Sequence, residues 1–211
     1  MYIFYKIALA IHIISGFNAL VIGMIAMTSK KGSKAHRLAG KIFVIAMLGV
    51  SISAIIISII KSIVFLLLIG VFAFYQNYSG YRAVNNKTLK PNIFDWMVLF
   101  IASINVFIMI YTMNIILIVF GGICMFLIFG QLRIFVKIIR NMEIPKLQWL
   151  RQHIGMMVGS YIATLTAFLV VNLKVFDPVW LPWLAPTFIL FPLIIYWIRK
   201  YTGETKGENI I

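Results

Sequence analysis

The sequence predicts an all-α polytopic membrane protein, a single domain built as a bundle of about seven transmembrane helices. Two observations predict this fold class: 63% of the 211 residues are hydrophobic, and only 11% are charged. An ordinary soluble domain is about 45–50% apolar and about 25% charged. A water-soluble protein of the present composition would expose large apolar patches and aggregate. The composition therefore excludes a soluble enzyme and a disordered chain.

Seven stretches of the chain are long and apolar enough to cross a bilayer, which takes about 20 mostly apolar residues per helix. They cover residues 3–28, 39–60, 63–84, 94–111, 115–138, 152–172 and 186–199. Only Lys61 and Ser62 separate the second stretch from the third, and only three residues separate the fourth from the fifth. Such short connections predict antiparallel neighbours. The first stretch is too long for a cleaved signal peptide.

The basic residues support the count of seven independently of the apolar stretches. With seven spans, sixteen of the nineteen Lys and Arg residues fall on the side that holds the C-terminus, and only Lys6, Lys61 and Lys174 fall on the other. An excess of Lys and Arg marks the cytoplasmic side of a membrane. We therefore expect a protein of the cell (cytoplasmic) membrane, with the N-terminus outside and the C-terminus in the cytoplasm. No basic cluster is interleaved with aromatic residues on a polar surface, so nucleic acid is not an expected partner.

The first span carries a histidine at the head of a stripe of small residues. Gly16, Ala19 and Gly23 lie within about 40° of His12 on a helical projection. Small residues let a neighbouring helix or a flat cofactor approach closely. His12 is therefore a candidate metal ligand, and the alternative is a hydrogen bond between helices.

The second and sixth spans each begin with a histidine on the same side of the membrane. His36 is followed one turn later by Gly40, and His153 is followed one turn later by Met157. Histidine is the usual axial ligand of b-type haem and a common metal ligand. If these spans are neighbours, the two rings converge on one ligand, with Arg37 placed to bind an anionic group. The alternative is that both histidines bind lipid headgroups or helix caps.

The third span ends with a polar face. Tyr75, Tyr78 and Arg82 follow the spacing of one side of a helix. This spacing places Arg82 where it could bind an anionic headgroup, a quinone oxygen or a haem propionate, with Tyr78 beside it. The alternative is an aromatic belt at the interface with a snorkelling arginine.

The scarcity of acidic residues, of lysine in the last span and of cysteine argues against several classes of function. None of the five acidic residues lies deep in a span, which argues against an ion-coupled pump. The last span has no lysine before Lys200, which argues against a retinal Schiff base. The single cysteine, Cys124, excludes an intrachain disulfide and a cysteine-based metal site. Trp180 and Trp183, just before the last span, predict an anchor at the membrane interface.

Four runs of the sequence, residues 12–23, 31–43, 79–82 and 153–172, together resemble a bacterial family of small membrane proteins catalogued as a domain of unknown function. That family has no settled activity, so the resemblance implies a membrane location and no mechanism. Its histidines on several spans are similar to those of small di-haem cytochromes, which carry four ligating histidines. This chain has three histidines, so the resemblance implies at most one bis-histidine haem.

Three functions follow as hypotheses. The first is a redox or cofactor-binding membrane protein that holds a b-type haem, a metal ion or a quinone at His36 and His153. The second is a small permease or exporter, and the third is a structural or regulatory membrane protein without a cofactor. The permease path would be lined by polar residues of the spans: His12, Asn77, Ser160 and Thr164. The sequence assigns no reaction, and partners beyond the lipid bilayer, including a second copy of the chain, stay open.

Overall fold

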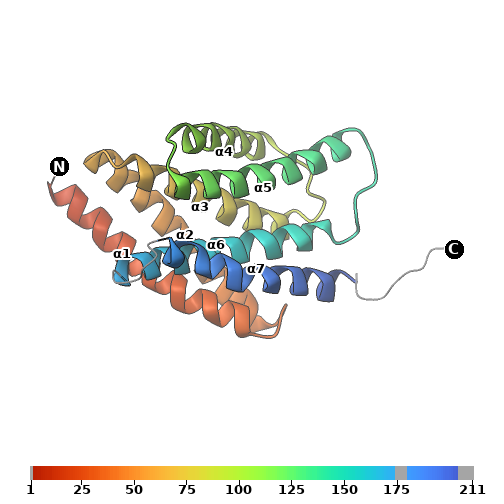
Figure 1. Ribbon diagram of the computed structural model, residues 1–211. Helices are drawn as coiled ribbons and strands as arrows, with labels where there is room; N and C mark the ends of the chain where they lie inside the picture. The colour runs from red at the N-terminus through yellow and green to blue at the C-terminus, as the bar shows by residue number, and fades with distance from the viewer. Residues whose placement is uncertain (1, 174–179, 204–211) are drawn as a thin grey trace.

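The computed structural model describes residues 2–173 and 180–203, and over these residues the chain forms seven α-helices and no strand (Figure 1). The helices are α1 Tyr2–Thr28, α2 Lys34–Lys61, α3 Val64–Asn85, α4 Ile93–Tyr111, α5 Ile115–Ile139, α6 Gln148–Asn172 and α7 Leu181–Thr202. All seven are long and apolar enough to cross a membrane. The expected all-α bundle of seven spans is therefore confirmed.

Three helices begin earlier than their apolar stretches predict. α2 begins at Lys34 because Ser33 caps it, accepting a hydrogen bond at 3.2 Å from the backbone N–H of His36. α6 begins at Gln148, one turn before its predicted span. In both cases the first turn is polar, and a hydropathy pattern alone does not reveal it.

α7 begins five residues before its predicted span. Pro182 stands in its first turn, where a missing N–H costs nothing, and Pro186 and Pro192 lie inside the helix. Such prolines are tolerated in membrane helices, where neighbouring groups satisfy the freed carbonyls. Trp183 lies within this helix, and its ring packs edge-on against Phe65 of α3 at a centroid distance of 5.2 Å. The bundle itself therefore holds this tryptophan.

Helices α3 and α6 lie at the centre of the bundle. α3 packs against α2, α4 and α6, while α6 packs against α1, α3 and α7. α1 and α2 form one closely packed pair, and α4 and α5 form a second pair over α3 (Figure 1). The two central helices therefore carry the contacts that join the rest.

Hydrogen bonds between polar side chains and backbone carbonyls connect the central helix to its neighbours. Asn77 Nδ2 of α3 donates to the carbonyl oxygen of Val44 on α2 at 3.1 Å. Asn105 Nδ2 of α4 donates to the carbonyl oxygen of Leu68 on α3, also at 3.1 Å. Inside a bilayer the hydrophobic effect does not drive helices together, so close packing and such bonds stabilise the bundle.

The small-residue stripe of α1 makes its tight contact at one position. A Cβ atom at Gly23 would lie 2.5 Å from the ring of Tyr161 and 2.9 Å from the ring of Phe43. At Gly16 the nearest such atom, a methyl carbon of Val50, is 4.0 Å away, an ordinary contact distance. Within the small-residue stripe, the close approach of α1 to α2 and α6 therefore depends on Gly23, and Gly49 of α2 allows a second close approach to Ser15 of α1.

Substitution at these two glycines should have opposite effects on stability. Gly23→Ala should lower the melting temperature in detergent, because overpacking a filled contact costs about 1–3 kcal/mol. Gly16→Ala should raise it slightly, because alanine is favoured over glycine in a helix by about 1 kcal/mol and meets no obstacle here. Equal melting temperatures for the two variants would contradict the close packing at Gly23.

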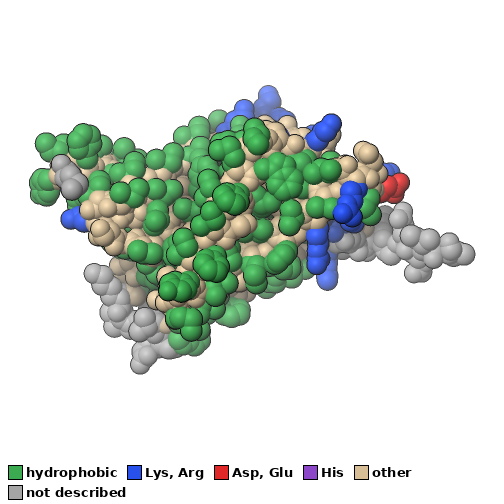
Figure 2. Space-filling view, turned by 90° about the horizontal axis from the view of Figure 1, so that it is seen from above, with side chains coloured by type: hydrophobic (Ala, Val, Ile, Leu, Met, Phe, Trp, Pro, Cys, Tyr) green, Lys and Arg blue, Asp and Glu red, His purple; other side chains and the backbone are tan. Residues whose placement is uncertain are grey.

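The basic side chains gather at one end of the bundle, where α1, α3, α5 and α7 end, and hydrophobic side chains cover its middle (Figure 2). Of the residues that the structure describes, only Lys6 and Lys61 lie at the opposite end, and Lys174 and Lys206 are outside the described ranges. The distribution follows the charge pattern of the sequence, and the orientation stays a prediction.

We predict that the basic end faces the cytoplasm. A green fluorescent protein fused after Lys90, in the α3–α4 connection, should fluoresce, and an alkaline phosphatase fused after Met113, in the α4–α5 connection, should be active. Each reporter at the other position serves as the control. If both positions report the same side of the membrane, α4 does not span it and the orientation is wrong.

Candidate functional site

Two imidazoles at the basic end of the bundle are held by backbone carbonyls of other helices. His36 Nδ1 of α2 donates to the carbonyl oxygen of Ala26 on α1 at 2.9 Å. His153 Nδ1 of α6 donates to the carbonyl oxygen of Gly80 on α3 at 3.0 Å. Because a carbonyl oxygen only accepts, Nδ1 carries the proton, and Nε2 of each neutral ring carries a lone pair. A metal-ligating histidine typically has this arrangement.

The two histidines lie near each other and near Lys31. His36 and Lys31 both lie within electrostatic range of His153, and we call these three residues the histidine cluster. Lys31, in the α1–α2 connection, lies 4.0 Å from the centroid of the Trp197 ring on α7. Burial lowers the pKa of Lys31 from its usual value, because it disfavours the charged ammonium. Five helices therefore meet around this cluster.

The residues expected beside the two rings differ in their surroundings. No atom lies within 4 Å of a Cβ placed at Gly40, so the space beside this turn of α2 is open. Met157 instead packs on α3, where its sulfur would lie 2.7 Å from a Cβ at Gly80. Arg37 is exposed in the first turn of α2. The open side of the cluster is therefore the side of α2.

Arg82 and Tyr78 bind a carboxylate of the chain itself, which the sequence analysis did not foresee. Arg82 Nε donates to Asp95 Oδ1 at 3.0 Å, and its Nη2 donates to Oδ2 at 3.1 Å. The Tyr78 hydroxyl donates to Asp95 Oδ1 at 2.6 Å. These bonds occupy the groups that we expected to bind a cofactor, and they join the end of α3 to the start of α4.

Asp95 also caps α4. Its Oδ2 accepts from the backbone N–H of Asn92 at 2.8 Å, and Asn92 Oδ1 accepts from the backbone N–H of Asp95 at the same distance. Asp95 is only 2% exposed, so its charge depends entirely on these partners. The spacing of Asn92 and Asp95 just before an apolar run is typical of a helix start and could have revealed this role from the sequence.

His12 lies apart from the histidine cluster. Its Nδ1 is 3.0 Å from Ser53 Oγ and 3.3 Å from the carbonyl oxygen of Val50, both on α2. Val50 lies about 20 Å along α2 from His36. His12 therefore makes a hydrogen bond between helices, which was the alternative to its binding a metal ion. In residues 2–173 and 180–203, no three His, Cys, Asp or Glu side chains group so that they could hold a metal ion.

The residues expected to line a permease path lie in helix contacts. Thr164 donates to the sulfur of Met47 at 2.9 Å, where α6 meets α2, and Ser160 is fully buried one turn away. Neither these residues nor Asn77 and His12 line the cavity described next.

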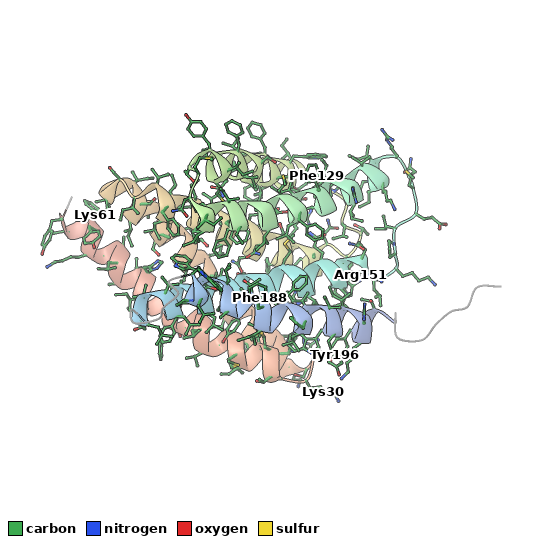
Figure 3. All side chains as sticks on the ribbon, viewed as in Figure 1. Lys30, Lys61, Phe129, Arg151, Phe188 and Tyr196 are labelled. Carbon is green, nitrogen blue, oxygen red and sulfur yellow. The ribbon has the colours of Figure 1, made fainter. Side chains whose placement is uncertain are left out.

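A cavity of about 1000 Å³ lies between α5 and α7, with α3 and α6 as its floor. Its walls are mostly apolar and include Phe188, which is labelled in Figure 3 together with Arg151 near the start of α6. Trp183 of α7 packs on Phe65 and lies 6.4 Å from Phe120 of α5, between ring centroids. This aromatic contact lies one turn before the first α7 residue of the cavity, so α7 is joined to α3 and α5 at that end.

Residues 9–99 match the model of a family described as a predicted membrane protein of unknown function, DUF2306. This match confirms the resemblance for the first three of the four runs, and residues 153–172 lie outside it. It covers most of α1, the whole of α2 and α3, and the first turns of α4, and it includes His36, Arg82 and Asp95. His153 and most of the cavity lie beyond it. No curated protein and no solved structure matches the chain.

Within the DUF2306 match, the bond between Arg82 and Asp95 should contribute strongly to stability. Asp95→Asn should lower the free energy of unfolding by about 3 kcal/mol, because breaking a buried ion pair leaves a charge without its partner. Glu143→Gln, at an exposed acid of the α5–α6 connection, should change it little. Thermal unfolding in detergent measures both. Equal stability of Asp95→Asn and the parent protein would contradict this role.

Proposed function

We propose that this membrane protein binds one b-type haem at the histidine cluster, on the cytoplasmic side of the cell membrane, and that His36 and His153 would hold it. The observation that carries the proposal is the pair of neighbouring imidazoles, each fixed through Nδ1–H to a carbonyl of another helix. This leaves two Nε2 lone pairs at one end of the bundle, as axial ligation requires.

The set of donor groups fits a haem better than a bare metal ion. A haem iron needs only two protein ligands, because the macrocycle supplies the other four. A bare transition-metal ion usually takes at least three protein ligands, and the described residues contain no group of three candidate side chains. Lys31 and Arg37 supply positive charge for the carboxylates of the cofactor.

The protein's contribution would be to fix the two rings and to limit water. The carbonyls of Ala26 and Gly80 set the tautomer and the direction of each imidazole. Bound haem iron exchanges one electron reversibly. A single haem near one face does not bridge about 30 Å of hydrocarbon, so we place its exchange partner on the cytoplasmic side and not across the membrane.

The visible spectrum tests this proposal. Protein purified from haem-supplemented cells should show a Soret band, and His36→Ala and His153→Ala should each abolish it. His12→Ala is the matched control and should keep the band, because His12 of α1 contacts α2 at Ser53, far along that helix from His36. A colourless parent protein would exclude haem. Metal analysis of the same samples would then reveal an ion bound through the two histidines.

A further inference from the structure

The cavity between α5 and α7 contains a buried polar group without a partner. Gln76 of α3 is 3% exposed and lines this cavity, and its Oε1 accepts no hydrogen bond from any residue that the structure describes. An unpaired buried acceptor is costly, and such groups call for an explanation. Gln76 therefore marks the place where a ligand would supply a donor.

A second amide on the same cavity offers the complementary group. Gln131 of α5 is 6% exposed and lines the cavity, and its Oε1 accepts from Tyr75 at 2.9 Å and from Ser79 at 3.3 Å. Because the oxygen is used, only Nε2 is left to face a ligand, and it donates to no residue described in the structure. Gln76 thus offers an acceptor and Gln131 a donor. The buried hydroxyl of Thr187 on α7 also lines the cavity and has no partner among the described residues, and Gln148, Arg151 and Gln152 line it near the start of α6.

The apolar walls leave room for a flat or chain-like body. A Cβ placed at Gly122, Gly130 or Gly155, all of which line the cavity, would meet no atom within 4 Å. The volume of about 1000 Å³ is at the upper end of ordinary ligand pockets. The glycines therefore widen the cavity on both the α5 side and the α6 side.

The position of the cavity indicates where its occupant comes from. Gln76 lies about 14 Å along α3 from the end of that helix at Asn85, and Gln131 lies about 12 Å along α5 from its end at Ile139. Both depths are inside the hydrocarbon of a bilayer about 30 Å thick. α5 and α7 are not among the helix pairs that pack closely. A molecule dissolved in the membrane can therefore enter between them.

We propose that this cavity binds a membrane-soluble molecule with a hydroxyl group on an apolar body, a quinol or a long-chain isoprenoid alcohol. The hydroxyl donates to Gln76 Oε1 and accepts from Gln131 Nε2, and the apolar body lies along the glycine-lined walls. A ketone or an oxidised quinone carries no donor for Gln76 Oε1. The proposal does not depend on haem binding.

Binding to the purified full-length protein in nanodiscs tests this assignment. The probes are a short-chain ubiquinol under reducing conditions, the matching ubiquinone, and farnesol. The hydroxyl-bearing probes should bind about tenfold more tightly than the ubiquinone, the loss expected for one buried hydrogen bond. Tighter binding of ubiquinol or of farnesol identifies which of the two sources is the occupant. Equal affinity for ubiquinol and ubiquinone would overturn the proposal.

Two variants locate the binding. Gln76→Leu should reduce the affinity for ubiquinol about tenfold and leave that for ubiquinone unchanged, whereas Asn18→Leu, at an exposed amide of α1 outside the cavity, should change neither. At Gly122 a Cβ would meet no atom within 4 Å, so Gly122→Phe should place its ring in the cavity and abolish binding of all three probes, and the test stands even if Gln76→Leu fails to fold. Unchanged binding in Gly122→Phe, or equal competition by an unsubstituted alkane, would show that ordinary lipid chains occupy the cavity and would overturn the proposal.

Discussion

A polar group inside a bilayer must find its partner within the protein, and the arrangement of this bundle follows from that constraint. α3 buries three polar side chains, Gln76, Asn77 and Ser79, and each helix that packs against α3 forms a bond with it. Asn77 reaches the backbone of α2, and Asn105 and Asp95 of α4 bind groups of α3. His153 of α6 binds the carbonyl of Gly80. The apolar packing around these bonds is compatible with many registers, but the bonds are formed in only one.

The sequence was sufficient to predict the helices because their signal is local. Apolar stretches of bilayer length and the separation of basic residues between two sides both depend on neighbours along the chain. The errors at the starts of α2, α6 and α7 have the same origin. A polar first turn capped by Ser33, or a first turn containing Pro182, lies outside the apolar window although it is helical.

The site was predicted only in part, because pairing between distant helices leaves little trace in one sequence. The positions of His36 and His153 at one depth follow from counting spans. The partner of Arg82 does not follow, because Asp95 stands in the next helix and looks like an ordinary loop acid. The cavity is even harder to predict from the sequence than the partner of Arg82. Gln76 and Gln131 are 55 positions apart, and the absence of close packing between α5 and α7 appears only when all seven helices are in place.

The histidine cluster and the cavity lie on different sides of one helix contact. His153 bonds to Gly80 on α3, and one turn earlier on α3, Gln76 packs against Gly159 of α6. A Cβ at Gly159 would lie 2.7 Å from Gln76 Nε2, so this approach is as close as the two helices allow. A larger residue at Gly159 would move α6 relative to α3 and would disturb both the histidine cluster and the cavity. The α3–α6 contact therefore sets the position of His153 and of the cavity floor together.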